Sequence, residues 1–202
     1  MTSAAKSRSH ALAVAAGSAA VILALQAVPD WQPALEYRRE LLAAQPWRLF
    51  TAHWVHLSWP HALVNAAAWL LLAPLFEASV GARRQLAVLA AAALAISLGL
   101  ALLYPSLAWY RGASGVLHAL YFAGAVLQGA ASAREKSGRG MAIAGALLAG
   151  GWIKVALELP PDAQTSYAEW LAAPIVPQAH LLGALAGCVA GVALALRAPL
   201  SR

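Results

Sequence analysis

The sequence is poor in charged residues and almost without cysteine. Only 11% of its 202 residues are charged, whereas a soluble domain usually carries about 25%. The single cysteine, Cys188, allows no intrachain disulfide, and the chain has no CxxC pair of the kind found in zinc ribbons. A soluble domain and a disulfide-stabilised fold are therefore excluded, and Cys188, inside an apolar run, is expected to be a small core residue.

The net charge of +6 forms no basic face of the kind that binds nucleic acid. The Lys and Arg residues lie in short clusters between long apolar runs. The chain is 61% hydrophobic and its mean hydropathy is +0.65. Because a run of about 20 apolar residues is long enough to cross a bilayer, this pattern predicts an all-α, polytopic membrane protein. Such a protein would contact membrane lipid and would not bind nucleic acid.

Six apolar runs are candidate spans, and we expect them to form a single membrane domain over residues 1–202. The first run follows a basic flank, as a cleaved signal peptide would, but it is long for a signal core and the topology needs it as a span. We therefore expect it to be retained. The first outer connection contains ALEYRRELLAA, which would form either a short interfacial helix or an ordered loop over the bundle. The predicted spans are approximately 10–28, 60–80, 86–104, 114–131, 140–159 and 177–196.

Basic residues are divided unequally between the two sides of this topology. With the N-terminus inside, the inner segments hold Lys6, Arg8, Arg83, Arg84, Arg134, Lys136, Arg139, Arg197 and Arg202. The outer segments hold only Arg38, Arg39, Arg48 and Arg111, together with the acidic residues Asp30, Glu36, Glu40, Glu158, Asp162 and Glu169. The excess of Lys and Arg on one side predicts that the N-terminus and the C-terminus are both cytoplasmic.

Four polar side chains fall at a similar depth near the outer face. His61 and Asn65 lie in the first turns of the second span, Ser114 opens the fourth, and His180 lies early in the sixth. These three spans run in the same direction, and polar residues inside spans are by default functional candidates. Small residues recur at every fourth position of the fourth and sixth spans, which serves packing and lets two helices approach closely. We therefore expect Ser114 and His180 to meet.

A serine and a histidine that meet in this way favour nucleophilic catalysis. A serine hydroxyl becomes a good nucleophile when a base within hydrogen-bond reach takes its proton. The start of a helix leaves backbone N–H groups unpaired, and Gly112 and Gly115 flank Ser114, which leaves room for a substrate backbone. These amides and the side chains of His61 and Asn65 would hold a developing oxyanion. Since no acidic residue lies at this depth in the even-numbered spans, we expect a dyad without a carboxylate partner.

These motifs, in this order, resemble the rhomboid intramembrane proteases. They are WRLFTAHWVHLSWPHALVNAAAWLL, with its Trp-Arg start and His-x-x-x-Asn, then FEASVG, GASG and AHLLGALAG, and together they cover approximately residues 46–196. The resemblance implies a six-helix rhomboid-like bundle that cleaves protein substrates with a transmembrane segment. It implies Ser114 as nucleophile, His180 as general base, and His61, Asn65 and the Ser114 amide as the oxyanion hole. It implies neither an organic cofactor nor a metal.

A histidine one turn after the serine resembles the rhombosortase subgroup, since many rhomboids have an aromatic residue at the position of His118. The likeness implies a multi-pass protein of the bacterial cytoplasmic membrane with its active site near the periplasmic face. Its substrates would end in a Gly-Gly motif, a hydrophobic span and a basic cluster, and would be cut by hydrolysis or transpeptidation. The alternative is a catalytically inactive rhomboid-like protein that binds client transmembrane segments.

Two further residues are candidates for supporting roles. His118 shares a helix face with Ser114 and would compete as the base. We favour His180, because His118 lies a full turn deeper, and we expect His118 to orient His180 or to fill the space beneath it. Lys154 is expected either to extend toward the membrane surface or to line the path of the substrate.

The remaining histidines precede the second span or begin it. His53, His56 and His61 offer an alternative interpretation as a metal-binding or transport protein, but their spacing fits no standard zinc motif. His56 corresponds to a histidine that rhomboids carry before the second span, and we expect it to brace the first loop.

Overall fold

Long apolar helices form most of the fold. The computed structural model describes residues 3–160 and 165–197. Five of its helices are long and apolar enough to cross a membrane, and α4 (Trp59–Leu75) is also apolar but has only 17 residues. The five are α1 (Ser3–Ala27), α6 (Ala82–Leu103), α7 (Ser114–Arg134), α8 (Gly138–Glu158) and α10 (Pro177–Arg197).

The second predicted span, residues 60–80, is not one continuous helix. α4 ends at Leu75, and a separate turn of helix, α5 (Glu77–Val80), follows it. Pro74 lies in the last turn of α4, and a proline there removes a backbone hydrogen bond and crowds the preceding turn. The apolar run is therefore longer than the helix that it forms.

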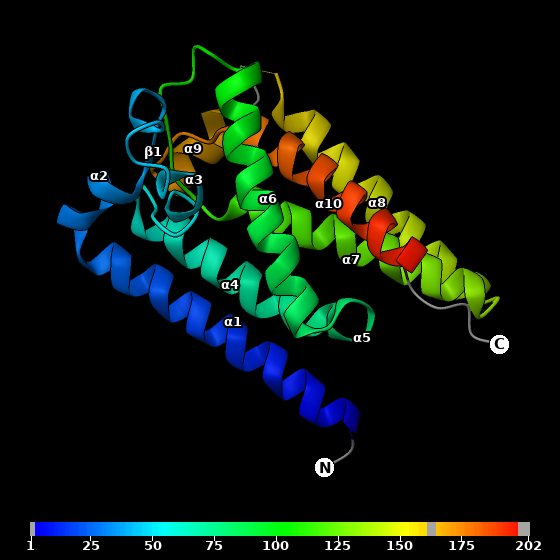
Figure 1. The fold of residues 1–202 in the computed structure, drawn as a ribbon. Helices are drawn as coiled ribbons and strands as arrows, with labels where there is room; N and C mark the ends of the chain where they lie inside the picture. The colour runs from blue at the N-terminus through cyan, green and yellow to red at the C-terminus, as the bar shows by residue number, and fades with distance from the viewer. Residues whose placement is uncertain (1–2, 161–164, 198–202) are drawn as a thin grey trace.

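α7 lies inside the bundle and packs against α4, α6, α8 and α10 (Figure 1). Its contact with α10 is the closest, because glycines of α10 lie directly on the α7 backbone. A Cβ atom added to Gly183 would lie 2.0 Å from the Gly115 carbonyl oxygen, and one added to Gly187 would lie 2.3 Å from that of Ala119. The close approach predicted from the small-residue spacing is thus confirmed.

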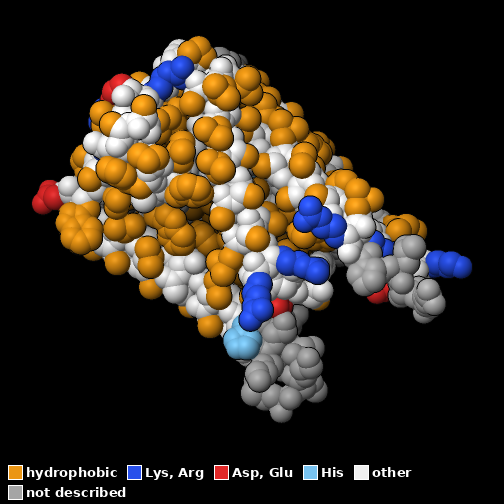
Figure 2. Space-filling model, in the orientation of Figure 1, with side chains coloured by type: hydrophobic (Ala, Val, Ile, Leu, Met, Phe, Trp, Pro, Cys, Tyr) orange, Lys and Arg blue, Asp and Glu red, His pale blue; other side chains and the backbone are white. Residues whose placement is uncertain are grey.

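The outer surface of the bundle is largely apolar. Hydrophobic side chains cover most of the face in Figure 2, and several Lys and Arg side chains gather toward one end of it. Large side chains of the spans point outward, including Leu102, Val189 and Leu196, which are 77%, 71% and 82% exposed. Such a surface suits lipid, which is as apolar as leucine.

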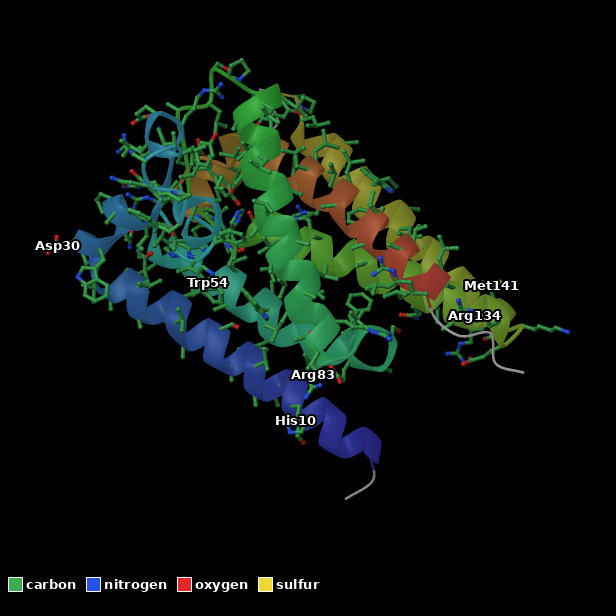
Figure 3. All side chains as sticks on the ribbon, in the orientation of Figure 1. His10, Asp30, Trp54, Arg83, Arg134 and Met141 are labelled. Atoms are coloured by element: carbon green, nitrogen blue, oxygen red, sulfur yellow. The ribbon has the colours of Figure 1, made fainter. Side chains whose placement is uncertain are left out.

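The two ends of the bundle differ in the residues that they carry. Arg83 and Arg134 lie at the end where α1 begins and α10 ends, and His10 lies there too (Figure 3). Asp30 lies at the opposite end, beside the short elements that follow α1 (Figure 3). The start of α7, with Ser114, lies toward this second end (Figure 1).

The first outer connection is an ordered loop, and the alternative of an interfacial helix over ALEYRRELLAA is wrong. The chain becomes extended at Glu36 and forms β1 (Tyr37–Arg38), which interrupts any helix there. β1 pairs with β2 (Trp109–Tyr110) in antiparallel register, with Tyr37 opposite Tyr110. The other short elements are η1 (Pro29–Trp31), α2 (Gln32–Leu35), η2 (Arg39–Leu41) and α3 (Arg48–Thr51).

Buried ionic groups join this loop to the segment before Ser114. Glu36 is 2% exposed and accepts hydrogen bonds from Arg38 and Arg111, both at 2.5 Å. Arg48 is also buried and donates to the carbonyl oxygens of Pro33 at 2.8 Å and Glu36 at 2.6 Å. Since Arg111 directly precedes Gly112, the loop holds the start of α7 in place.

Candidate active site

Ser114 and His180 meet where α7 and α10 begin. Ser114 Oγ and His180 Nε2 are 2.8 Å apart, and His180 is 6% exposed. On its other side, His180 Nδ1 lies 2.8 Å from Glu158 Oε2. A carboxylate only accepts hydrogen bonds, so Nδ1 carries the ring proton and donates it to Glu158. The Nε2 lone pair therefore faces Ser114 and accepts from its hydroxyl.

Glu158 corrects one of our predictions. We expected a dyad without a carboxylate partner, yet Glu158, the last residue of α8, is 7% exposed and lies against His180. The comparison of even-numbered spans missed it because α8 is the fifth predicted span. A signal was present in the sequence: Lys154 and Glu158 are four residues apart, the spacing of an ion pair on one helix face. Such a pair in an apolar helix marks a functional candidate.

Lys154 does not simply extend toward the membrane surface. Its Nζ donates to Glu158 Oε1 at 2.6 Å and lies 3.1 Å from His118 Nε2. An ammonium group only donates, so His118 Nε2 is the acceptor. The Lys154 side chain remains 48% exposed, and it also lines the cavity beside Ser114. The second alternative for Lys154, a place along the path of the substrate, stays a prediction.

His118 lies beneath His180. Its Nδ1 donates to the backbone carbonyl oxygen of Ser114 at 2.7 Å, since a carbonyl oxygen only accepts. The two imidazole rings are stacked, with centroids 4.3 Å apart and an angle of 17° between their planes. Both nitrogens of His118 are thus engaged away from the Ser114 hydroxyl. Of these two residues, His180, and not His118, therefore has a ring nitrogen within hydrogen-bond distance of the Ser114 hydroxyl.

His61 and Asn65 line the same cavity as Ser114. Asn65 Nδ2 donates to the His61 carbonyl oxygen at 2.9 Å, which leaves its second amide proton for another acceptor. His61 Nδ1 is buried and has no hydrogen-bond partner among the residues that the structure describes. The His61 ring lies against Gly112, where an added Cβ atom would be 3.0 Å from its Nε2.

The two glycines that flank Ser114 are not among the residues that line the cavity, and their expected role in leaving room for a substrate backbone stays a prediction. Gly115 faces α10, where a Cβ atom would lie 2.9 Å from the Ala179 carbonyl oxygen. Gly112 faces His61 and has a φ of 131°, a backbone conformation that favours glycine. Both therefore serve the close packing around Ser114.

His56 supports the backbone just before Ser114. Its Nε2 accepts from the Ala113 N–H at 3.3 Å, and its ring packs edge-on against His61 with centroids 4.9 Å apart. Burial lowers the pKa of His56 to about 3, which keeps Nε2 free to accept. Tyr110 holds the same segment by donating to the Gly112 carbonyl oxygen at 2.5 Å. His56 thus links the first connection, in which it lies, to the start of α7.

The structure does not assemble the alternative metal site from His53, His56 and His61. His53 Nε2 lies 3.2 Å from the carbonyl oxygen of Ala93 and 3.2 Å from Ser97 Oγ, both on α6. In the described part of the chain, the group of three possible metal ligands is His118, Glu158 and His180, whose ligand atoms lie within 4.8 Å of one another. The Lys154 ammonium already contacts two of these three side chains.

A cavity of about 380 Å³ joins these side chains. Seven polar residues line it around Ser114, and the rest of its wall is mostly apolar, so we call it the active-site cavity. Its polar residues are His61, Asn65, Ser114, His118, Lys154, Glu158 and His180. The others are Val64, Ala68 and Leu72 of α4, Leu117 and Tyr121 of α7, Gly150 and Gly151 of α8, Trp170 and Leu171 of α9 (Thr165–Leu171), and Ile175.

The apolar helices and the cluster of serine, histidine and glutamate define a multi-pass membrane protein with a candidate site for serine-based chemistry. The family model of the Rhomboid domain matches residues 43–197. The chain therefore belongs to the rhomboid family, which confirms the resemblance at the level of the family. Membership implies, at that level, an intramembrane serine protease that acts on transmembrane substrates. A comparison with curated proteins finds no match.

Gly112 provides a first test of the packing around the site. In Gly112→Ala, the added Cβ atom would lie 2.9 Å from His61 Cε1, and the positive φ would be strained. Strain of this kind costs on the order of 1–3 kcal/mol, so we expect the melting temperature in detergent to fall by about 2–12 °C. The matched control is Gly17→Ala, which meets nothing within 4 Å. Equal melting temperatures for Gly112→Ala and the wild type would contradict this account of the turn.

Proposed function

We propose that this protein is an intramembrane serine protease in which Ser114 is the nucleophile and His180 the general base. The observation that carries the proposal is the 2.8 Å contact between Ser114 Oγ and His180 Nε2. It lies in a mostly apolar cavity between helices that pack backbone to backbone. A hydroxyl that donates to a neutral imidazole can pass its proton to that ring while the oxygen attacks a carbonyl carbon.

The proposed reaction has two steps. As Ser114 Oγ bonds to the scissile carbonyl carbon, His180 Nε2 takes the hydroxyl proton and then gives it to the leaving amine, which departs as the peptide bond breaks. His180 then deprotonates a water molecule, which attacks the acyl carbonyl carbon; as the ester bond to Ser114 Oγ breaks, His180 returns the proton to that oxygen. A second amine in place of water would give transpeptidation. The second amide proton of Asn65, together with His61 and the Ser114 N–H, would stabilise the oxyanion.

The shape of the active-site cavity supports a substrate that spans the membrane. Polar residues surround Ser114, whereas side chains of α4, α7 and α9 make the rest of the wall mostly apolar, as a hydrophobic segment requires. We include α4 as a sixth span of a single membrane domain. The end that carries Arg83 and Arg134 would then be cytoplasmic, with both termini, and Ser114 would lie near the periplasmic face of a bacterial cytoplasmic membrane.

We further propose that the substrates are secreted proteins with a rhombosortase-type tail, which has a Gly-Gly motif, a hydrophobic span and a basic cluster. The support for this subgroup is His118, which takes the place of an aromatic residue one turn after Ser114 and stacks on His180. A Gly-Gly motif has no side chains, so it fits beside the crowded backbone before Ser114, where His61 packs against Gly112.

The experiment that tests the proposal is cleavage in liposomes by purified protein, with products identified by mass spectrometry. We expect cleavage near the Gly-Gly motif of a model tail, and no product from Ser114→Ala. An otherwise identical tail with Gly-Gly replaced by Leu-Leu is the matched control for the subgroup. An added amine distinguishes transpeptidation from hydrolysis, because it would be incorporated into the new carboxyl end.

Two results would overturn parts of the proposal. Equal Ser114-dependent cleavage of both tails would retain the protease and overturn the rhombosortase-type specificity. If neither tail gives a Ser114-dependent product but both co-purify with the protein, the chain is instead an inactive binder of transmembrane segments.

A further inference from the structure

We infer that Glu158 is the positioning residue of this active site, fixing the tautomer and orientation of His180, and that Lys154 holds Glu158 in place. The inference rests on the proposed function of Ser114 and His180. It goes beyond a serine and histidine pair, because it assigns a role to a carboxylate and an ammonium on a third helix, α8.

The first observation is a chain of hydrogen bonds with only one consistent direction. Lys154 donates to Glu158 Oε1, and Glu158 Oε2 accepts from His180 Nδ1. His180 Nε2 then accepts from Ser114 Oγ. Because an ammonium only donates and a carboxylate only accepts, the chain leaves the Nε2 lone pair facing the hydroxyl. This is the tautomer that a general base needs.

A second chain of hydrogen bonds also joins Lys154 to Ser114. Lys154 donates to His118 Nε2, and His118 Nδ1 donates to the carbonyl oxygen of Ser114. The two imidazoles stack on one another between these chains. Lys154 therefore reaches Ser114 by two routes, one through Glu158 and His180 and one through His118. Neither ring can rotate without breaking a hydrogen bond.

The charges of the cluster suit the reaction. Glu158 is buried, and a buried carboxylate needs a partner, which the half-exposed Lys154 supplies as an i, i+4 ion pair. When His180 takes the proton of Ser114, the new positive charge forms 2.8 Å from the carboxylate. The positive charge of Lys154 disfavours the protonated His180 less strongly than the Glu158 carboxylate favours it. Lys154 contacts the other oxygen of Glu158, farther from His180, and its charge is screened by solvent. Glu158 would thus favour the protonated histidine of the transition state.

Glu158→Gln tests the tautomer directly. Lys154 only donates, so it would hold the amide oxygen of the new side chain and leave the amide N–H₂ facing His180 Nδ1. His180 would then carry its proton on Nε2 and point an N–H at Ser114. In a serine protease whose histidine is held in the wrong tautomer, kcat falls about 10⁴-fold, and we expect a loss of about 10²–10⁴-fold with little change in KM.

A second variant separates this effect from a fault in folding. In Glu158→Gln combined with Lys154→Met, the amide is free to turn its oxygen toward His180 Nδ1, which restores the required tautomer. We therefore expect the double variant to be more active than Glu158→Gln alone, although it lacks one more native side chain. Lys154→Met alone is the matched control, and we expect it to lose less activity than Glu158→Gln because Glu158 still accepts from His180.

The decisive readouts are kcat, KM and the ring ¹⁵N NMR shifts of histidine-labelled protein in detergent. We expect the His180 proton on Nδ1 in the wild type and the double variant, and on Nε2 in Glu158→Gln. Wild-type kcat in Glu158→Gln, or an unchanged His180 tautomer, would overturn the role of Glu158 alone. A double variant no more active than Glu158→Gln would overturn the role of Lys154. Absence of any Ser114-dependent product from the wild type would overturn the proposed function itself, and with it this inference.

Discussion

His180→Ala is expected to reduce kcat by several orders of magnitude in reconstituted membranes. His180 Nε2 is the nitrogen that faces the Ser114 hydroxyl, while both nitrogens of His118 are engaged with Ser114 O and Lys154. Without the base, Ser114 keeps its proton and is a poor nucleophile. Removing the histidine or the serine of a protease triad costs on the order of 10⁶-fold in kcat. The measurement is the initial rate of product formation in liposomes, at saturating substrate.

Two comparisons give this prediction its specificity. We expect kcat to fall no further in Ser114→Ala, or in the double variant Ser114→Ala with His180→Ala, than it does in His180→Ala. The reason is that residues that act as one unit do not contribute additively to kcat. His118→Ala should only weaken cleavage, since His118 supports His180 from beneath. If His118→Ala abolished cleavage and His180→Ala retained it, the base would be His118, and the proposed assignment would be wrong.

The broad architecture and the pair at its centre were accessible from the sequence. Hydropathy indicates each apolar run, and five of the six runs correspond to one long helix each, while the second is divided between α4 and α5. Twenty apolar residues have few alternatives to a helix in a membrane. The meeting of Ser114 and His180 followed from small residues at every fourth position, which bring α7 against α10. The long apolar runs and the four-residue spacing of small residues are both regular patterns, so they could be found from the sequence.

The predictions that differ from the structure concern the ends of helices and the contacts between neighbouring helices. Glu158 is the last residue of α8, at the end of the predicted span 140–159, and was counted with the acidic residues of the outer side, although it lies 2.8 Å from His180. Pro74 and Phe76 divide the second run near its C-terminal end. Gly115 follows Ser114, and only the rotation of α7 against α10 shows that it faces Ala179. The depth of a residue along a span can be predicted from the sequence. The rotation of a helix about its own axis, and its contacts with neighbouring helices, depend on tertiary packing.

The close contact of α7 with α10 makes Gly183→Ala the second prediction with a large effect. The added Cβ atom would lie 2.0 Å from the Gly115 carbonyl oxygen and 2.9 Å from its carbonyl carbon. These are backbone atoms in a helix, so no side chain can turn aside and α10 itself must move. Gly183 is less than one turn from His180, and Gly115 follows Ser114, so the shift would separate Ser114 Oγ from His180 Nε2. A misplacement of about 1 Å can cost on the order of 10²-fold, and we expect kcat to fall at least that far.

Position along α10 distinguishes this geometric effect from a general loss of stability. Gly191→Ala would place its Cβ atom 2.8 Å from Val126 Cβ and 3.1 Å from the Ala123 carbonyl oxygen, which is less crowded than the contact at Gly183 and farther from the active site, so kcat should fall much less than in Gly183→Ala. Gly145→Ala on α8 meets nothing within 4 Å and should leave both kcat and the melting temperature near wild type. Gly183→Ala with wild-type kcat would contradict the packing of α7 on α10. Equal losses of kcat in Gly183→Ala and Gly191→Ala, with equal falls in melting temperature, would mean that the glycines stabilise the bundle without setting the distance from Ser114 to His180.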